Sequence, residues 1–302
     1  IALAKLLKAV SLGELIESYQ SIPVEVTTSS TPKFADRATV LATIVTLLEE
    51  AQSTLAATPP SEEFNKNILG IGFDLANTIW AMLARYALIQ GSNQKALDAA
   101  NQVDLNAVSS LFFNNSDARN PVWFQTQDRG FYKPVDAWRE AAEPGDQRVN
   151  FWVKEGEGIS FLGKPVDEFN QYLQADSPYY IYLPGEIMLI KAEAYARMGD
   201  LANALVEVNN VRTKTTDAVG LGAGLPPKTA AELPTQEAML DEIFKQRSLE
   251  LLMTGLRLGD TRRFNLPGAT ADASVRTRTR NWMPYSDGER STNPNTPPDP
   301  EI

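Results

Sequence analysis

The chain has 302 residues, of which 43% are hydrophobic, so it is long enough for a large core in one or two domains. Its formal net charge of −10 disfavours nucleic acid as a ligand, because nucleic-acid affinity depends on clustered cations that neutralise phosphates. It contains no histidine and no cysteine, which excludes histidine bases, cysteine nucleophiles and almost all zinc, haem and iron–sulfur sites. We therefore expect no catalytic residue, no metal site and no cofactor.

Helix-capping residues and prolines predict a helical first third of the chain. Asp36 is a good N-cap, because its carboxylate can accept hydrogen bonds from the free amides of a first helical turn. Thr58-Pro59-Pro60 ends the helix that Asp36 begins, since proline cannot continue it. The helices expected in this part cover residues 1–19, 37–57, 67–90 and 93–103.

Helical periodicity fades after the first third and returns only later in the chain. In the intervening stretch Gly, Pro and Asn punctuate short runs, which is typical of irregular structure. Helices are expected again over 185–199 and 201–213, followed by a Gly/Pro/Thr-rich loop over 214–234. Thr235 is predicted to cap a further helix that reaches about residue 254.

A helix-turn-helix pattern occurs twice, 108 residues apart. The first copy covers residues 84–103 and the second covers 192–211. Small residues at matched positions allow two helices to approach closely, and a glycine ends the first helix in a left-handed conformation. The matched pairs are Ala84/Ala192, Gly91/Gly199, Ala96/Ala204, Leu97/Leu205, Asn101/Asn209 and Val103/Val211. This pattern indicates a tetratricopeptide-like pair of helices, a unit that builds concave scaffolds.

We predict one domain over residues 1–302 in the mainly α fold class. A tetratricopeptide-like helical repeat scaffold is assigned to 1–103 and 183–265. It is interrupted by an irregular, aromatic-rich insertion at 104–182 and followed by an irregular tail at 266–302.

The insertion is the candidate ligand region. It holds more than half of the aromatic residues of the chain, next to many amides, carboxylates and guanidiniums. Flat rings can stack on the C–H groups of a sugar while planar polar groups bind its hydroxyls. The predicted ligand contacts are Trp123, Trp138, Trp152, Tyr132 and Arg148. The alternative is that an irregular segment needs its large side chains to build a core of its own.

The helix expected after residue 235 is rich in charged residues, for which two interpretations remain. Arg247 and Glu250, like Arg257 and Asp260, are three residues apart and could meet on one helical face. In one interpretation Arg247, Arg257, Arg262 and Arg263 clamp an anionic ligand. In the other, which we favour because each arginine has an acid nearby, they form a structural ion-pair network that reaches Glu186 or Glu193.

Several motifs of the second half resemble the SusD/RagB family. The run from Tyr180 to Ala194 resembles the first half of the family signature, and Gly199-Asp200 with Asn209-Asn210-Val211-Arg212 resembles its continuation. The segment from Gln246 to Arg263 is similar to the charged C-terminal run of the family. Weaker similarity is found in residues 1–25, in Asp146-Gln147-Arg148 and in Trp282-Met283-Pro284-Tyr285. The chain departs from the pattern at Gln246 and Thr254, where the family usually has glutamate.

The resemblance implies a function. SusD-like proteins are outer-membrane lipoproteins of Gram-negative bacteria that bind oligosaccharides, or sometimes peptides, and cap a TonB-dependent, SusC-like β-barrel transporter. By resemblance, 104–182 would bind the nutrient and the repeats would face the transporter. The protein would be a cell-surface or periplasm-facing lipoprotein whose lipid anchor lies outside this chain.

Two alternatives to this function remain open. A SusD-like scaffold could instead serve as an accessory or structural subunit of a membrane complex that binds no sugar. Glu140 and Glu143 could be drawn as a glycosidase pair, but neighbours on one helix seldom flank a sugar from opposite sides. We therefore predict no enzyme.

Overall fold

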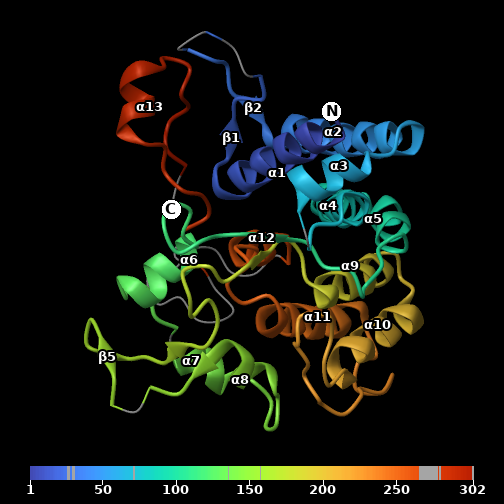
Figure 1. The fold of residues 1–302 in the computed structure, drawn as a ribbon. Coiled ribbons are helices and arrows are strands. Elements are labelled where there is room, and N and C mark those ends of the chain that lie inside the picture. The colour runs from blue at the N-terminus through green and yellow to red at the C-terminus, as the bar shows by residue number, and fades with distance from the viewer. Residues whose placement is uncertain are drawn as a thin grey trace. The chain divides into compact units, whose positions relative to one another are not determined.

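The computed structural model describes residues 1–25, 28, 31–70, 72–134, 136–156, 158–264, 278 and 280–300. The chain divides into two compact units, whose helices and strands are labelled in Figure 1. Unit 1 comprises Ile1–Ile68, Leu75–Val103 and Thr254–Ile302, and unit 2 comprises Leu69–Asp74 and Asp104–Met253. The secondary structure is mainly helical, as the sequence predicts.

Unit 1 is a set of helices in which each long helix packs on the next. Helix α1 packs on α2, α2 on α4 and α4 on α5. The buried face of α1 consists of small and apolar residues at helical spacing, among them Leu6, Ala9 and Ile16. The bounds are α1 Ala2–Ser18, α2 Arg37–Ala57, α3 Glu62–Phe64, α4 Leu75–Gln90, α5 Asn93–Ala100, α12 Arg257–Arg263 and α13 Asp287–Thr292, with β1 Ser21–Ile22 antiparallel to β2 Ala35–Asp36.

Helix α2 begins and ends where the sequence predicts. The Asp36 carboxylate accepts a hydrogen bond of 2.8 Å from the N–H of Thr39, and backbone hydrogen bonding from Thr39 lowers the pKa of Asp36. Within the described part of the chain, α2 is the one helix that could cross a membrane by length and composition. Its apolar residues Val40, Ile44 and Leu48 are fully buried in unit 1.

A glycine lets α1 and α4 approach closely. Tyr86 of α4 is 1% exposed and lies directly against Gly13 of α1. A Cβ atom added at Gly13 would stand 2.0 Å from the Tyr86 hydroxyl oxygen, well inside any allowed contact. Burial raises the pKa of the Tyr86 phenol, so this hydroxyl stays neutral in the core.

Helix α4 starts at Leu75, later than the helix expected from residue 67. The chain from Asn65 to Leu69 forms the π-helix η1. Gly70 and Gly72 then take φ values of +75° and +86°. These left-handed conformations interrupt a right-handed helix, so the helical prediction for residues 67–74 is wrong for all but the η1 turn.

The two predicted repeat pairs form and have the same turn geometry. Gly91 between α4 and α5 has a φ of +90°, and Gly199 between α9 (Pro184–Arg197) and α10 (Leu201–Thr213) has a φ of +85°. The N–H of each glycine donates to the carbonyl three residues earlier, at 2.9 and 3.0 Å. The next N–H, of Ser92 or Asp200, donates five residues back at 2.9 Å in both turns. The repeat prediction is confirmed, with one pair in unit 1 and one in unit 2.

In unit 2, α9, α10 and α11 (Gln236–Glu250) pack on one another. Thr235 caps α11 as predicted, and its hydroxyl accepts a hydrogen bond of 3.1 Å from the N–H of Ala238. The helix ends at Glu250, earlier than expected. The cause lies just beyond, where Met253 takes a left-handed φ of +64°.

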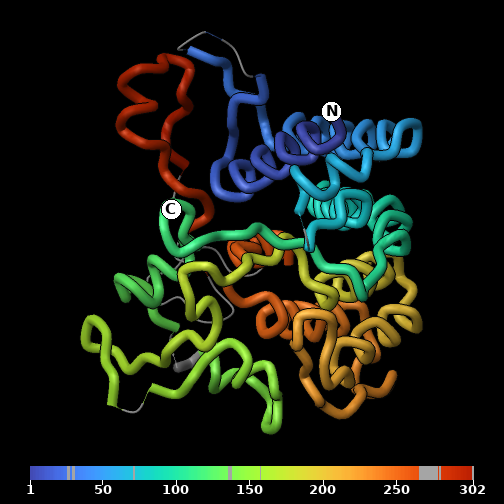
Figure 2. The backbone as a smooth tube through the Cα atoms, in the orientation of Figure 1, coloured from blue at the N-terminus to red at the C-terminus, as the bar shows by residue number. Residues whose placement is uncertain are grey.

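The insertion is irregular, as predicted, with only short elements (green to yellow-green in Figure 2). Its helices are α6 Pro121–Trp123, the π-helix η2 Phe124–Asp128, α7 Asp136–Glu140 and α8 Arg148–Trp152. Its antiparallel strand pairs are β3 Ser110–Leu111 with β8 Tyr179–Tyr180, β4 Val153–Lys154 with β7 Glu168–Phe169, and β5 Ser160–Phe161 with β6 Lys164–Pro165.

The predicted tail at 266–302 lies partly outside the described residues, at 266–277, 279, 301 and 302. Its described part is mostly irregular and carries α13.

Candidate functional site

Asn120 fixes the start of α6 within unit 2. This residue is fully buried, and its side-chain oxygen accepts hydrogen bonds from the N–H groups of Val122 and Trp123, at 2.7 and 3.1 Å. Its side-chain nitrogen donates to the carbonyl of Ser177 at 2.7 Å, and its own N–H donates to Ala175 at 2.7 Å. The turn that carries Trp123 is therefore attached to the segment before β8.

Four aromatic residues gather on the turn that follows. Helix α6 runs directly into η2, a π-helix of the kind often found at functional sites. Beyond it, Gly130 has a φ of +63° and the N–H of Phe131 donates to the carbonyl of Gln125 at 2.9 Å. This hydrogen bond holds residues 131 and 132 beside η2. We call the following four residues the aromatic cluster: Trp123, Phe124, Phe131 and Tyr132.

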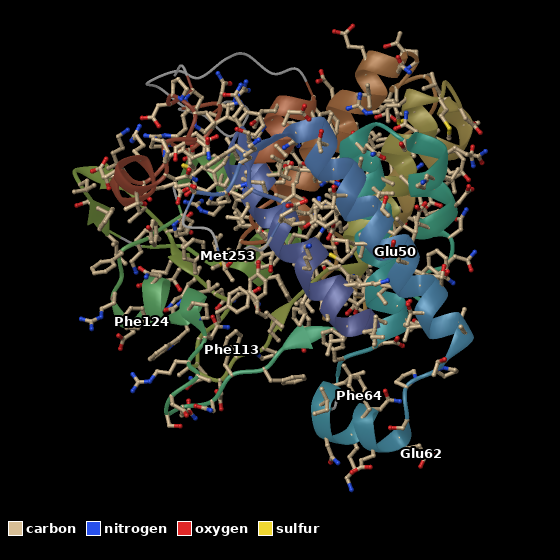
Figure 3. All side chains as sticks on the ribbon, turned by 90° about the horizontal axis from the view of Figure 1, so that it is seen from above. Glu50, Glu62, Phe64, Phe113, Phe124 and Met253 are labelled. Carbon is tan, nitrogen blue, oxygen red and sulfur yellow. The ribbon has the colours of Figure 1, made fainter. Side chains whose placement is uncertain are left out.

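The aromatic cluster presents ring surface to solvent. Phe131 is 58% exposed and Tyr132 is 62% exposed, while Trp123 and Phe124 are half-buried. The guanidinium of Arg129 lies 5.0 Å from the centroid of the Phe124 ring, in a cation–π contact. In Figure 3, Phe124 marks this turn. Rings and a flat guanidinium on one anchored turn are suited to stacking against an apolar face that also carries hydroxyls.

Two of the three predicted tryptophans are buried instead. Trp138 is 7% exposed, and its indole N–H donates at 3.0 Å to the carbonyl of Ser248 on α11. Trp152 is 2% exposed and meets the Phe151 ring edge to face, with 4.9 Å between centroids. Both side chains fill the interior of unit 2, so in this conformation they offer almost no surface to a ligand.

Arg148 is the centre of a buried ion-pair network. It has no exposed surface and binds the Asp146 carboxylate through two hydrogen bonds, of 2.9 and 2.7 Å. It also donates to Glu250 at 3.3 Å and to the side-chain oxygen of Gln246 at 2.7 Å. Burial works against the charged form, but the bond to Asp146 and the charge of Glu250 outweigh it and raise the pKa of Arg148. This arginine thus has a structural partner set and no free face for a ligand.

A second ion-pair network lies beside the first. Arg212 of α10 binds the Glu143 carboxylate through two hydrogen bonds, of 2.7 and 3.0 Å, and Glu242 through one of 2.6 Å. The hydrogen bond from Arg212 lowers the pKa of Glu143 to about 2, and Lys245 adds to this effect. Because both of its carboxylate oxygens accept hydrogen bonds from Arg212, Glu143 has a structural role.

Gln246 joins the two networks. Its side-chain oxygen accepts from Arg148, and its side-chain nitrogen donates to Glu242 at 2.7 Å. An uncharged amide can serve an arginine on one side and a carboxylate on the other, which a glutamate at this position could not do while ionised. Together the networks attach residues 143–148 of the insertion to α10 and α11, and so fix this part of the irregular segment on the helices of unit 2.

The arginines of the alternative anion clamp make contacts within the protein. Arg263 pairs with Asp260 at 2.9 Å. Arg262 donates to the carbonyls of Glu17 and Asn281, each at 2.7 Å, and stacks 3.8 Å from the Trp282 ring centroid. Its pKa is lowered to about 10, chiefly by burial. Arg247, in unit 2, is 4% exposed. These positions agree with the favoured interpretation, a structural network.

The structure thus places Trp123 and Tyr132 on either side of the η2 turn and buries Trp138, Trp152 and Arg148 in the interior of unit 2. Sequence reasoning did not select Phe124 and Phe131. The Asn-Pro pair at 120–121 and Gly130 could have indicated a capped turn at this place. Within the described residues, no group of three or more acidic side chains lies where it could hold a metal ion.

Comparison with known proteins gives a consistent result for the fold. The model of the SusD family matches residues 76–301. No curated protein matches the chain.

Solved structures provide three similar folds from Bacteroides. A SusD-like protein from Bacteroides fragilis has a TM-score of 0.70 and 14% identity, covering 98% of this chain and 78% of its own. A SusD-like carbohydrate binding protein from the same species has a TM-score of 0.66 and 15% identity, covering 98% and 79%. Surface glycan-binding protein A from Bacteroides uniformis has a TM-score of 0.63 and 18% identity, covering 99% and 77%. At these identities the likeness establishes a shared fold.

Proposed function

We propose, from the premise that the chain belongs to the SusD family, that it binds an oligosaccharide through the aromatic cluster. The observation that carries this proposal is the exposure of Phe131 and Tyr132, at 58% and 62%, on a turn fixed by internal hydrogen bonds. Covering exposed apolar surface with a ligand stabilises the complex by about 25 cal/mol per Å². A sugar ring can cover it with C–H groups while its hydroxyls remain hydrated.

The polar groups around the aromatic cluster support a sugar over a purely apolar ligand. Arg129 is more than half exposed, and its guanidinium already lies over the Phe124 ring. The half-buried Gln125 lies on the same π-helical turn. Such groups can pair with adjacent hydroxyls without reorganising. Contacts of this kind are shallow, and we expect dissociation constants of roughly micromolar to millimolar, or about −4 to −8 kcal/mol.

The cellular role follows from the family by analogy. We propose that the protein hands its ligand to a TonB-dependent, SusC-like β-barrel. In this role it is a lipid-anchored protein of the outer membrane of a Gram-negative bacterium. The similarity to proteins described as carbohydrate binding and as surface glycan-binding supports the ligand-binding part of this role.

A glycan array followed by titration calorimetry tests the binding proposal. We expect Trp123→Ala and Tyr132→Ala to weaken binding of the best polysaccharide by about tenfold each, since each removes roughly 1–1.5 kcal/mol of stacking. Phe64→Ala is the matched control, because Phe64 is a half-buried ring on α3 in unit 1.

Two results would reject the proposal. The first is unchanged affinity in both cluster variants. The second is an array without sugar hits, combined with a native partner that is not a TonB-dependent barrel. That second result would favour the accessory-subunit alternative.

A further inference from the structure

A β-hairpin arm projects from the insertion of unit 2. We define the arm as residues 153–156 and 158–169. At its base β4 pairs with β7, and beyond them the N–H of Val166 donates to the carbonyl of Ile159 at 3.3 Å. Near the tip β5 pairs with β6, and Leu162 and Gly163 make the turn. The described part of the arm therefore consists of two short antiparallel strand pairs, one at its base and one near its tip.

The tip of the arm combines backbone strain with apolar exposure. Leu162 has a φ of +51° and Gly163 a φ of +76°, so both central residues of the turn are left-handed. Such turns strongly prefer Asn-Gly, because a left-handed leucine is sterically unfavourable. Leu162 is nonetheless 89% exposed, and Phe161 and Ile159 are each 37% exposed. A strained and solvated apolar residue is explained if a ligand covers it.

The base of the arm is joined to the chain that carries the aromatic cluster. The N–H of Asp167 donates to the carbonyl of Pro134 at 3.0 Å, and Gln127 donates to the carbonyl of Phe169 at 3.2 Å. From Asp167 to Lys164, three steps of extended chain cover roughly 10 Å, and the turn at Leu162 and Gly163 lies beyond them. Figure 1 shows β5 of the arm on the same side of unit 2 as α6.

We infer that the arm is a second contact surface for the oligosaccharide held by the aromatic cluster, and that the ligand is accordingly an extended chain of several sugar units. The inference rests on the proposed function. A mono- or disaccharide held on the cluster leaves uncovered a tip that lies more than about 10 Å beyond the base contact. A longer chain can lie on the cluster with one part and cover Phe161 and Leu162 with another, which removes apolar surface from water at both places.

Leu162→Asn separates this function from the fold of the arm. Asparagine followed by Gly163 is the preferred sequence for such a turn, so the variant should keep or improve the stability of the hairpin. At the same time it removes the apolar tip. A second variant, Phe161→Ser, removes the neighbouring ring without changing the turn. Val206→Asn is the matched control, since Val206 is an apolar residue of α10 that is 55% exposed.

The probes are size-fractionated fragments of the polysaccharide that binds best on a glycan array. We expect the wild type to bind fragments of about eight units at least tenfold more tightly than fragments of two or three units. Leu162→Asn and Phe161→Ser should lose about fivefold to tenfold on long fragments and nothing on short ones, and Val206→Asn should match the wild type.

The outcomes are distinct. If the wild type shows no gain with length, or if both arm variants keep the gain, the arm is not a ligand surface, while binding of short fragments still supports the proposed function. If no fragment of any length binds, the proposed function fails and the arm inference fails with it.

Discussion

The Arg148 guanidinium and the Glu250 carboxylate form an ion pair of 3.3 Å in which neither side chain has exposed surface. Arg148 begins α8 in the insertion, and Glu250 is the last residue of α11. The pair therefore connects the irregular segment of unit 2 to its helical frame. Replacing such a pair by apolar residues can be neutral, but removing one partner leaves a buried charge without compensation.

We predict that Arg148→Met destabilises the protein by about 3–5 kcal/mol, because Asp146 loses its charged partner and Glu250 loses one of the two cations that pair with it among the described residues. Urea unfolding at neutral pH measures the change. Arg290→Met provides the comparison, since it removes an exposed pair with Asp299 and should cost far less. An equal decrease of the free energy of unfolding in the two variants would show that the buried Arg148 network stabilises the fold no more than an exposed ion pair does.

The three tryptophans of the insertion should respond differently to truncation. We predict that Trp138→Ala and Trp152→Ala each cost about 3–5 kcal/mol, because both side chains are buried and leave a cavity. Trp123→Ala should cost much less, since Trp123 is only half-buried at the surface. Thermal unfolding followed by circular dichroism ranks the three. A Trp123 variant as unstable as the other two would place that ring in the core and remove it from the aromatic cluster.

The contact between Gly13 and Tyr86 predicts a coupled pair of substitutions. Gly13→Ala should destabilise unit 1 by about 1–3 kcal/mol or more, because the new methyl group would overlap the Tyr86 ring. Tyr86→Leu alone also destabilises by leaving a cavity, but in the double variant the methyl group has room. A double-mutant cycle in urea should therefore give a favourable coupling of at least about 1 kcal/mol. Simple additivity would mean that the two helices do not meet at this point.

Glu143 gives the stability of unit 2 a defined dependence on pH. The hydrogen bond from Arg212 lowers the pKa of Glu143 from 4.5 to about 2. A carboxyl with a lowered folded pKa stabilises the fold above its unfolded pKa, and this contribution is lost as the pH falls towards the folded value. We predict that Glu143→Gln costs on the order of 2 kcal/mol at pH 7, allowing for partial screening by solvent.

The difference between wild type and Glu143→Gln should then shrink as the pH falls from about 4.5 to about 2. Comparing the two proteins at each pH cancels carboxyls that both share, such as Glu232. Glu140→Gln is the control, since Glu140 is exposed on α7. A pH-independent difference would argue against the Arg212 contact as its origin.

Local features of the fold could be predicted from the sequence. Asp36 and Thr235 cap α2 and α11, because a capping side chain bonds to amides only two or three residues away. Gly91 and Gly199 end α4 and α9 for an equally local reason. Helical periodicity alone predicts that α4 begins at residue 67. Gly70 and Gly72 interrupt the helix there, so α4 begins later, at Leu75.

The candidate site was only partly predictable, because burial depends on distant partners. Trp138 is buried against Ser248, which is 110 residues later in the chain. Arg148 is held by Glu250, which is 102 residues later. The residues next to Trp138 and Arg148 in the sequence give no sign of these distant partners. Their polar neighbours therefore led to the prediction of an exposed site. The turn that carries Trp123 is anchored through Asn120, whose partner Ser177 is 57 residues later in the chain.

Hydrogen–deuterium exchange with the best-binding polysaccharide tests the account most directly. If the aromatic cluster is the ligand surface, saturating ligand will slow exchange in residues 121–134. The ligand should leave the repeat pair at 84–103 unchanged. Protection confined to the repeats, or none in residues 121–134 while the ligand is bound, would contradict the account.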